Sequence, residues 1–177
     1  GLREAGMKIP MKAMAIVKNL PLGGSFTFPD GTVLTQSEVV EPPRPGRKVV
    51  ILGDTADARA IAGLAEGTDL LVHEATNTFL PGIDKDSNTH LVAKDAKAHG
   101  HSTPFIAGEF ARRIKARKLV INHFSARYKG DQSLESMSIM SRIEGQAAKS
   151  SGLSREEVAA AWDFMILPIK RKESSDI

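Results

Sequence analysis

The sequence predicts an α/β fold, and three observations support that prediction. From residue 48 onward, short apolar segments alternate with segments of helical periodicity. The short segments are apolar throughout, as expected of parallel strands buried on both faces. The chain has 177 residues, of which 41% are hydrophobic, so it can form one domain with its own core. Alternation of this kind is typical of layered α/β proteins.

Four segments are predicted to be strands of this sheet. The first three are rich in leucine and β-branched residues, and each runs into polar residues. The fourth is expected to close the domain near its C-terminal end. These strands are KVVIL (48–52), DLLV (69–72), KLVI (118–121) and WDFMILPI (162–169).

Helices are predicted between and after these strands. The clearest begins after Thr103, a good N-cap, with Pro104 at the first helical position. Ile106, Phe110 and Ile114 then repeat every four residues, which indicates one buried helical face. The predicted helices span 57–67, 91–98, 104–117, 133–149 and 154–161.

The pattern divides the chain into three parts. Residues 1–24 are apolar with interspersed lysines, and we treat them as a separate segment. Residues 25–167 are predicted to form the main domain, beginning with a hairpin around Pro29-Asp30-Gly31 and a proline-rich connector at 39–48. Residues 168–177 are a polar tail.

Composition excludes several kinds of site. There is no cysteine, so a metal ion could be held only by His, Asp or Glu. The net charge of +3 permits a polyanionic partner without requiring one. No apolar run approaches the roughly 20 residues of a membrane helix, and no apolar signal region follows the first charges. We therefore expect an intracellular protein without membrane contact, in the cytoplasm, nucleus or an organelle matrix. The first residue is glycine, so we interpret the chain as a fragment or a processed product.

Polar side chains follow three predicted strands at the point where each strand ends. Asp54 follows the first, His73 and Glu74 the second, and His123 the third. In layered α/β folds, ligands gather beyond such strand ends, so these side chains are expected to converge. Each one alone has a structural alternative: Asp54 could cap a helix, and a histidine at a strand end could simply be buried.

The residue types suggest two kinds of chemistry. Asp54 and His123 suit zinc or manganese, and the aspartate carboxylate could bridge two ions. Glu74 with His73 or His101 suits proton transfer, because a carboxylate on one imidazole nitrogen fixes the tautomer and leaves the other nitrogen to donate. His101 could alternatively belong to a local helix cap. The remaining histidines, His90 and His99, are expected to be exposed to solvent.

Basic residues near His123 could contact phosphate. Arg127, followed by Tyr128, is close enough in sequence to His123 to place a guanidinium beside a metal site. An ordinary surface arginine is the alternative. The basic run at 112–118 could follow a phosphate backbone, although basic residues are common at helix C-termini.

These motifs together resemble one family, tRNase Z, the tRNA 3′-processing endoribonuclease of the metallo-β-lactamase superfamily. The resemblance covers roughly residues 46–128, and the segment WDFMILPI is similar to the end of the family's short form. The motifs occur in the family's order: GDT (53–55), HEAT (73–76), HST (101–103) and HFSARY (123–128).

The resemblance implies a fold and an activity. The fold would be the C-terminal half of a metallo-β-lactamase αββα sandwich, with residues 1–24 as a divergent exosite-like segment. The reaction would be phosphodiester hydrolysis that removes the 3′ trailer of precursor tRNA and leaves a 3′ hydroxyl on the tRNA. The complete enzyme would use two Zn²⁺ ions, with Mn²⁺ as an alternative.

The resemblance also implies roles for single residues. Asp54 and His123 would be metal ligands. His101 would protonate the leaving 3′ oxygen, oriented by Glu74, and His73 is grouped with this catalytic pair. Residues expected to contact the substrate are Thr103, Arg127 and Tyr128.

Two departures from the family pattern matter. The signature His-x-His-x-Asp-His is absent, and five histidines cannot complete a two-zinc site. We therefore expect the missing N-terminal half of the domain as a partner, with a homodimer as a further option. The 177-residue chain alone is expected to bind zinc weakly, through Asp54 and His123, and to be inactive. The exosite-like segment also lacks the family's glycines and tyrosine, which puts the usual tRNA-elbow contact in doubt.

Three functions are compatible with the sequence. The first is part of a zinc-dependent endoribonuclease, which accounts for Asp54, Glu74, His101 and His123 together. The second is a non-catalytic tRNase Z-like RNA-binding or scaffold component of a larger assembly, which accounts for the absent signature. The third is another metallo-β-lactamase phosphodiesterase, which would not be expected to carry HEAT and HST.

Overall fold

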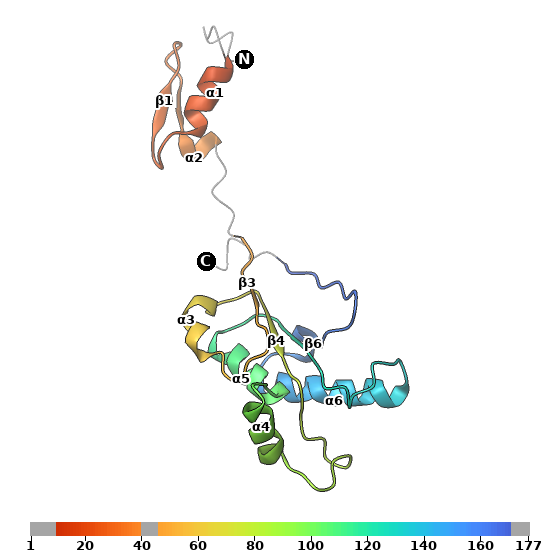
Figure 1. Cartoon of the computed structure of the whole chain (residues 1–177). Helices are drawn as coiled ribbons and strands as arrows, with labels where there is room; N and C mark the ends of the chain where they lie inside the picture. The colour runs from red at the N-terminus through yellow and green to blue at the C-terminus, as the bar shows by residue number, and fades with distance from the viewer. Residues whose placement is uncertain (1–9, 40–45, 171–177) are drawn as a thin grey trace. The chain divides into compact units, whose positions relative to one another are not determined.

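A computed structural model describes residues 10–39 and 46–170 of the chain (Figure 1). The chain divides into two units, residues 1–45 and 46–177, rather than at the predicted position after residue 24. The predicted hairpin thus groups with the first segment and not with the main domain. Within the described ranges, no helix has the length and apolar character needed to cross a membrane.

The first unit contains the predicted hairpin. Its two strands pair antiparallel with Phe26 opposite Leu34, and Gly31, at φ +87, lies in the turn. Val17 and Phe28 are buried in this unit. Residues 40–45 of the predicted connector lie outside the described residues. The elements are α1 (Pro10–Lys18), β1 (Ser25–Thr27), β2 (Val33–Thr35) and α2 (Gln36–Val39).

The second unit is built on one parallel sheet of four strands in the order β3-β4-β5-β6. His73 on β4 pairs with Ile121 on β5, and Glu74 pairs with Asn122. The carboxyl ends of all four strands therefore meet at one edge, which the sequence predicted for the first three. The strands are β3 (Val49–Ile51), β4 (Leu70–Glu74), β5 (Leu119–Asn122) and β6 (Val158–Ala160).

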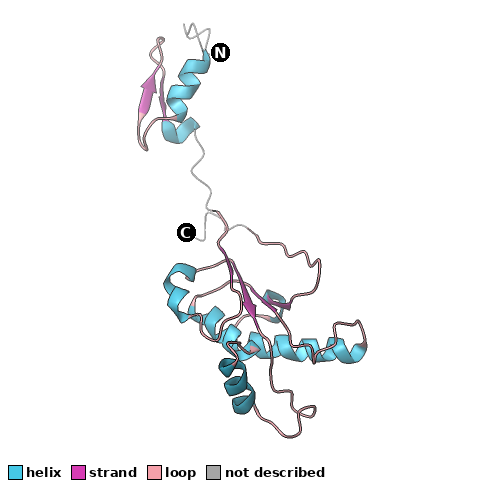
Figure 2. Ribbon diagram, in the orientation of Figure 1, coloured by secondary structure: helices cyan, strands magenta, loops and turns pink. Residues whose placement is uncertain are grey.

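Helices pack on one face of this sheet and enclose the core (Figure 2). Leu71, Leu119 and Ile121 point toward them and are fully buried. Phe110 and Ile143 fill the space from the helical side. The helical segments are η1 (Arg59–Ile61), α3 (Ala62–Ala65), α4 (Thr89–Ala98), α5 (Pro104–Arg113), α6 (Leu134–Ser151) and η2 (Arg155–Glu157).

The α/β prediction is confirmed, with one sheet and one helical layer. α5 begins as predicted, since Thr103 Oγ1 accepts a hydrogen bond from the backbone N–H of Ile106. It ends earlier than predicted, because Lys115 adopts φ +55, which a continuing helix cannot accommodate.

Two predictions at the C-terminal end are wrong. Residues 154–161 do not form a helix: a 3-10 turn at 155–157 is followed by β6, which pairs with β5. The opportunity to complete the sheet outweighs the helix propensity of the alanines there. Residues 162–169 do not form a strand, and Phe164, at φ +62, lies fully exposed. The apolar pattern alone could not distinguish a strand from an exposed apolar loop.

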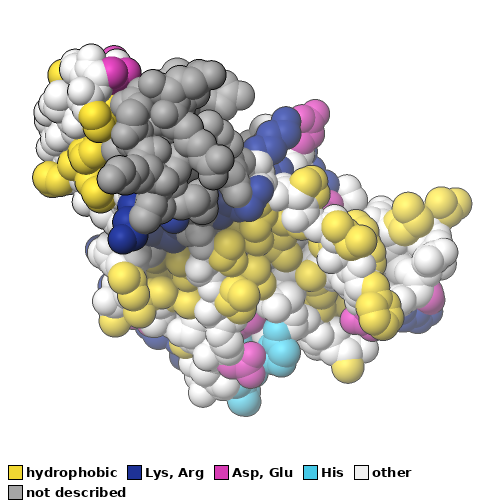
Figure 3. All heavy atoms as spheres, turned by 90° about the horizontal axis from the view of Figure 1, so that it is seen from above, with side chains coloured by type: hydrophobic (Ala, Val, Ile, Leu, Met, Phe, Trp, Pro, Cys, Tyr) yellow, Lys and Arg dark blue, Asp and Glu magenta, His cyan; other side chains and the backbone are white. Residues whose placement is uncertain are grey.

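The sheet face opposite the helices carries apolar side chains that remain accessible. Ile51 is 72% exposed and Val49 is 44% exposed, both on β3. Figure 3 shows hydrophobic side chains gathered on the side of the molecule that it presents. Exposed apolar residues in the loop after β6 include Trp162, Phe164 and Ile166. A parallel sheet normally has both faces covered, so this surface is unusual for a self-contained domain.

Close packing of α5 against α6 depends on Gly108. A Cβ atom at this position would lie 2.4 Å from the backbone oxygen of Ala147 and 2.0 Å from the Ser150 hydroxyl oxygen. The two helices can approach this closely only because residue 108 has no side chain.

Gly108→Ala should therefore destabilise the second unit by about 1–3 kcal/mol, the usual cost of overpacking a core. The measurement is the free energy of unfolding in urea. Gly145→Ala is the matched control, because its Cβ would meet nothing closer than an Arg155 nitrogen at 3.9 Å. Equal stability of the two variants would show that the interhelical contact is looser than described.

The exposed sheet face should bind apolar dyes in the isolated chain. The double substitution Val49→Lys with Ile51→Lys should reduce this binding, while stability changes by less than about 1 kcal/mol because both side chains are exposed. Leu64→Lys is the control, since Leu64 is 82% exposed on α3. Dye fluorescence that stays unchanged in the double variant would place the apolar surface elsewhere.

Candidate metal centre

Three loops at the carboxyl edge of the sheet bring together one aspartate and two histidines. Asp54 follows β3, His123 follows β5, and His101 precedes α5. Each offers one ligand atom, and these atoms lie within 4.8 Å of one another. The sequence predicted Asp54 and His123 as metal ligands, and the structure adds His101 to the same cluster.

His123 occupies a strained backbone position. Its φ is +54, a left-handed conformation that non-glycine residues rarely adopt. Its Nδ1 lies 2.9 Å from the Thr76 hydroxyl oxygen and 3.4 Å from Asp54 Oδ1. The strain lets the chain turn directly after β5, so that the imidazole faces Asp54 instead of continuing along the strand. Strain of this kind is typical of functional sites.

Glu74 is the buried carboxylate that connects the loops of the site. Its side chain is almost completely buried at the end of β4. Oε2 accepts hydrogen bonds from the Thr76 backbone N–H at 3.0 Å and from the Thr76 hydroxyl at 2.9 Å. Oε1 accepts from the backbone N–H groups of Ser102 at 2.5 Å and Thr55 at 3.4 Å. One carboxylate thus ties together the segments that carry Asp54 and His101, and Thr76 extends the network to His123.

This network determines the tautomer of His123. The single hydroxyl proton of Thr76 is donated to Glu74 Oε2. The short contact between Thr76 Oγ1 and His123 Nδ1 therefore requires the imidazole to donate from Nδ1. In the neutral ring, Nε2 is left with its lone pair and is free to bind a metal ion.

His101 lies beside the same carboxylate. Its Nδ1 lies 3.7 Å from Glu74 Oε1, and this buried nitrogen has no hydrogen-bond partner among the described residues. Its ring centroid is 5.2 Å from that of His123. Because Nδ1 is buried toward Glu74, Nε2 is the nitrogen available to an external partner.

His73 does not join this cluster. Neighbouring side chains on a strand point to opposite faces, so His73 faces the helices while Glu74 faces the site. His73 Nδ1 donates to the backbone oxygen of Glu74 at 2.7 Å, and its ring packs edge-on against Phe110. It lines a separate cavity of about 520 Å³ with Arg59, Lys97 and Arg113 among its other walls. The geometry therefore does not support grouping His73 with His101 as a proton-transfer pair.

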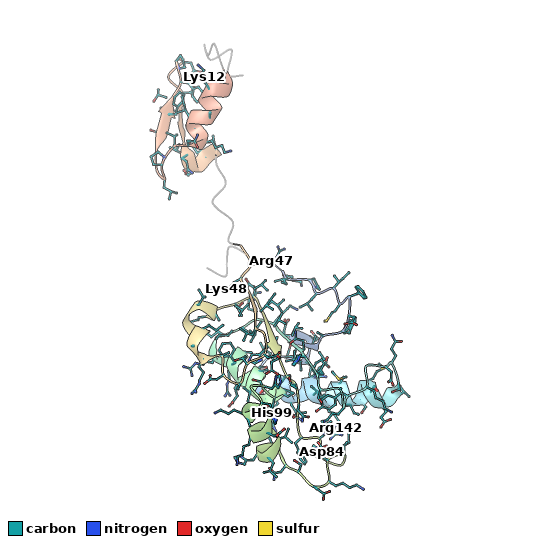
Figure 4. The ribbon with its side chains drawn as sticks, in the orientation of Figure 1. Lys12, Arg47, Lys48, Asp84, His99 and Arg142 are labelled. Carbon is teal, nitrogen blue, oxygen red and sulfur yellow. The ribbon has the colours of Figure 1, made fainter. Side chains whose placement is uncertain are left out.

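Arg127 and Tyr128 hold the loop after β4. The Arg127 guanidinium bonds both carboxylate oxygens of Asp84, at 2.9 and 3.0 Å, and the backbone oxygen of Thr78 at 2.8 Å. The Asp84 carboxylate raises the pKa of Arg127, and Arg127 in turn lowers that of Asp84. The Tyr128 hydroxyl donates to Asn77 Oδ1 and accepts from the Thr78 backbone N–H. Asp84 and Arg142, which also binds this loop, are labelled in Figure 4.

Thr103 is engaged in helix capping and is 4% exposed. Its neighbour Ser102 was not singled out in the sequence, yet it supports the site through its backbone N–H on Glu74 and its hydroxyl on the Thr55 backbone oxygen. Thr55 and Thr76 were likewise missed as supporting residues. All three lie inside the GDT, HEAT and HST motifs, so membership of these motifs was the signal that could have identified them.

The donor set fits a zinc-type ion. Two imidazoles and one carboxylate are common zinc ligands, and the chain offers no thiolate. A further buried oxygen, Asn122 Oδ1, has no partner within the described ranges and lies in the strand end that leads into His123. Orphaned polar atoms beside a ligand cluster are the feature expected where an ion or its bound water completes the site.

Comparison with known proteins agrees with the motifs. Ribonuclease Z of Anoxybacillus flavithermus is 38% identical over 162 residues, which are 92% of this chain and 45% of that protein. Zinc phosphodiesterase ELAC protein 1 of Bos taurus is 35% identical over 174 residues, or 97% of this chain and 44% of that protein. This chain is related to ribonuclease Z. It spans a little under half the length of the ribonuclease Z relatives it matches.

Two further comparisons complete the picture. The crystal structure of the short form of human tRNase Z aligns with a TM-score of 0.45 and 31% identity, covering 78% of this chain and 37% of that one. No protein-family model matches the chain. The resemblance to ribonuclease Z inferred from the motifs is thus confirmed by the sequence relatives.

Burial of His73 should make stability depend on pH. Burial disfavours the charged imidazole and lowers the pKa of His73 below 6.5. The unfolded chain then binds a proton that the folded chain does not, so the stabilisation is present above pH 6.5 and declines as the pH falls below it.

His73→Leu should therefore flatten the loss of unfolding free energy between about pH 7.5 and about pH 5. Urea unfolding across this range is the measurement, and His90→Ala is the control because His90 is exposed. A wild-type slope that persists in His73→Leu would assign the acid sensitivity to other groups.

Proposed function

We propose that this chain is part of a zinc-dependent endoribonuclease that removes 3′ trailers from precursor tRNA by phosphodiester hydrolysis. The observation that carries the proposal is the convergence of Asp54, His101 and His123 on one point around a buried Glu74, in a chain related to ribonuclease Z. A scaffold protein would have no use for this arrangement. Because precursor tRNA is made inside the cell, we also place the protein there.

In this proposal, Asp54 and His123 hold metal. Both side chains are about half exposed, so an ion and a substrate phosphate can reach them. A metal ion held by these residues would lower the pKa of its bound water and stabilise charge on the phosphoryl oxygens. The Nδ1–H of His123 donates to the Thr76 hydroxyl oxygen, and this hydrogen bond orients Nε2 for metal binding.

His101 is the proposed proton donor to the leaving 3′ oxygen. Glu74 Oε1 lies 3.7 Å from Nδ1, which leaves Nε2 as the nitrogen that would donate to the leaving group. The side chain is only 24% exposed, which limits competition from water. Glu74 would thus act through His101 as a positioning residue.

Arg127 remains the candidate for a phosphate contact, with a changed role. Its guanidinium is 36% exposed and already shared with Asp84, so it would present a partly neutralised charge to the RNA. Arg127 and Tyr128 would contribute mainly by holding the loop at 77–84 beside the site. Thr103 would contribute by fixing the start of α5 behind His101.

We propose that the part of the relatives outside the match covers the open sheet face. More than half of each relative lies outside the match. The exposed side chains of Ile51 and Val49 offer an apolar surface that this part would cover. This second half would also supply the metal ligands that the chain lacks. A homodimer through the same face is the alternative arrangement.

The absence of His-x-His-x-Asp-His favours a second candidate, a non-catalytic RNA-binding or scaffold component. The two functions differ in one measurable outcome. Adding the missing half of the domain should give RNA cleavage if the chain is part of an enzyme, and no cleavage if it is a scaffold.

A chimeric protein tests the proposed function. In this chimera, the present chain replaces the 162 matched residues of Anoxybacillus flavithermus ribonuclease Z. We expect the chimera to cleave precursor tRNA that carries a 3′ trailer. In this chimera His101→Ala should lower single-turnover cleavage by roughly 10²–10⁴-fold with tRNA affinity retained, as expected for general acid catalysis. His123→Ala should lose bound zinc and activity together.

The Glu74→Gln substitution refines this test. The double variant Glu74→Gln with His101→Ala should be little worse than His101→Ala alone, because the two residues act as a unit. If the folded, zinc-loaded chimera binds precursor tRNA without cleaving it, the non-catalytic alternative is correct. If His101→Ala changes only the melting temperature, His101 serves the fold rather than the reaction.

A further inference from the structure

We infer that a cavity on the helical side of the second unit binds a small organic phosphate, at a site separate from the metal cluster. The cavity has a volume of about 520 Å³, and residues of the loop after β3, of β4, of α4 and of α5 line it. We call it the His73 cavity, after the buried histidine in its wall. The inference goes beyond the proposed RNA cleavage and does not depend on it. The charged residues of the wall are Asp57, Arg59, Lys97, Glu109, Arg112 and Arg113.

The wall of the His73 cavity carries more positive than negative charge, since it holds four basic side chains and two acidic ones. Each acidic side chain lies beside an arginine. Asp57 Oδ1 accepts a hydrogen bond from Arg59 Nε at 2.8 Å, and Glu109 Oε1 lies 3.8 Å from Arg112 Nη2. These pairs offset the two carboxylates, so the remaining two cations determine how the cavity treats an anion.

Lys97 and Arg113 are the cations left to bind an anion. Neither side chain forms an ion pair or a hydrogen bond within the part of the chain that the structure describes. Arg59, through its hydrogen bonds, lowers the pKa of the Asp57 carboxyl, and Lys97 adds a smaller electrostatic effect, as expected if its ammonium faces the same cavity. Because Lys97 lies on α4 and Arg113 on α5, an anion bound to both would bridge the two helices with charge-assisted hydrogen bonds.

His73 adds a polar group at the inner wall, because its side chain lines the cavity although it is only 1% exposed. Nδ1 lies 2.7 Å from the Glu74 backbone oxygen, which can only accept, so Nδ1 carries the proton. Nε2 makes no hydrogen bond within the described ranges and is the nitrogen left for a ligand. A phosphate suits it in either state: a P–OH group donates to the neutral nitrogen, and the protonated ring donates to a phosphate oxygen.

The His73 cavity has room for more than a phosphate group. Pockets that bind small molecules usually measure roughly 300–1,000 Å³, and this cavity, at about 520 Å³, falls within that range. Ala56, Ala58, Ile106 and Phe110 add apolar wall beside the charged groups. Apolar wall accepts the organic part of a ligand while a few polar groups fix its orientation. A small organic phosphate therefore fits the cavity better than the bare ion.

The His73 cavity lies apart from the surfaces already assigned. The missing half of the domain is proposed to cover the sheet face opposite the helices, whereas this cavity lies on the helical side. Neighbouring side chains of β4 point to opposite faces, so His73 faces the cavity and Glu74 faces the metal cluster. A phosphate in the cavity would therefore be bound without a metal ion.

Calorimetric titration of the 177-residue chain in EDTA tests the inference, with adenosine 5′-monophosphate and the smaller ribose 5-phosphate as probes. We expect one site per chain and weaker binding of adenosine and of inorganic phosphate than of adenosine 5′-monophosphate. Lys97→Gln and Arg113→Gln should each lower the affinity for adenosine 5′-monophosphate by roughly tenfold, since each removes a hydrogen bond to a charged group. Lys94→Gln is the matched control, because Lys94 is exposed on α4 and does not line the cavity.

Ile106→Trp tests the cavity itself. Ile106 is half-buried in the wall, so a larger side chain would fill the space and leave every charged group in place. Affinity for adenosine 5′-monophosphate should fall at least as far as in Lys97→Gln, with the melting temperature as the check on folding. In NMR spectra, the ring nitrogens of His73 should shift when adenosine 5′-monophosphate is added, while those of the exposed His90 stay unchanged.

Several results would overturn the inference. Absence of binding for both organic phosphates would do so, as would equal affinity in folded Lys97→Gln, Arg113→Gln and Lys94→Gln. Adenosine bound as tightly as its monophosphate would show that the cavity does not recognise phosphate, and inorganic phosphate bound equally well would show that it recognises only the ion. Binding that requires zinc and disappears in EDTA would place the phosphate on the metal cluster. Failure of the chimera to cleave RNA would leave these results unaffected.

Discussion

The architecture of the site depends on one buried carboxylate, that of Glu74. It stands at the end of β4 and accepts hydrogen bonds from residues in three different loops: Thr55 after β3, Thr76 after β4 itself, and Ser102 before α5. A buried carboxylate is costly unless its oxygens are fully hydrogen-bonded. The loops that satisfy Glu74 are therefore held in place by the same requirement. Two of them carry Asp54 and His101, and Thr76 of the third contacts His123.

The parallel sheet makes this arrangement possible. Because the strands run in the same direction, their polar ends meet at one edge, with Glu74 directly opposite Asn122 in register. The alternation of side chains along β4 then sends Glu74 toward the site and His73 into the helical side. The left-handed backbone at His123 completes the geometry by turning the chain at the strand end. Local conformation, strand register and burial thus combine to place three donor groups within reach of one ion.

Much of the fold could be predicted from the sequence, because its signals were local. The Thr103 cap with Pro104 fixes the start of α5, and the hydrophobic runs mark β3, β4 and β5. The end of the chain could not be predicted in the same way. Val158–Ala160 becomes a strand only because Leu119–Ile121 offers a pairing edge, and the apolar segment after it finds no such edge within the described residues. For the site, residue types identified Asp54 and His123. The place of His73 could not be predicted, because it depends on which face of β4 its side chain occupies. The pairing of Arg127 with Asp84 could not be predicted either, because it joins residues that are distant in the sequence.

The central claim is that Glu74 fixes the orientation and tautomer of both histidines of the cluster. Nitrogen-15 NMR of the imidazole rings in the metal-free chain, at a pH where both are neutral, tests it most directly. The account predicts that His101 and His123 both carry the proton on Nδ1, that Thr76→Val releases His123 alone, and that Glu74→Gln disturbs both rings. Finding the proton on Nε2 of both histidines in the wild-type chain would contradict it.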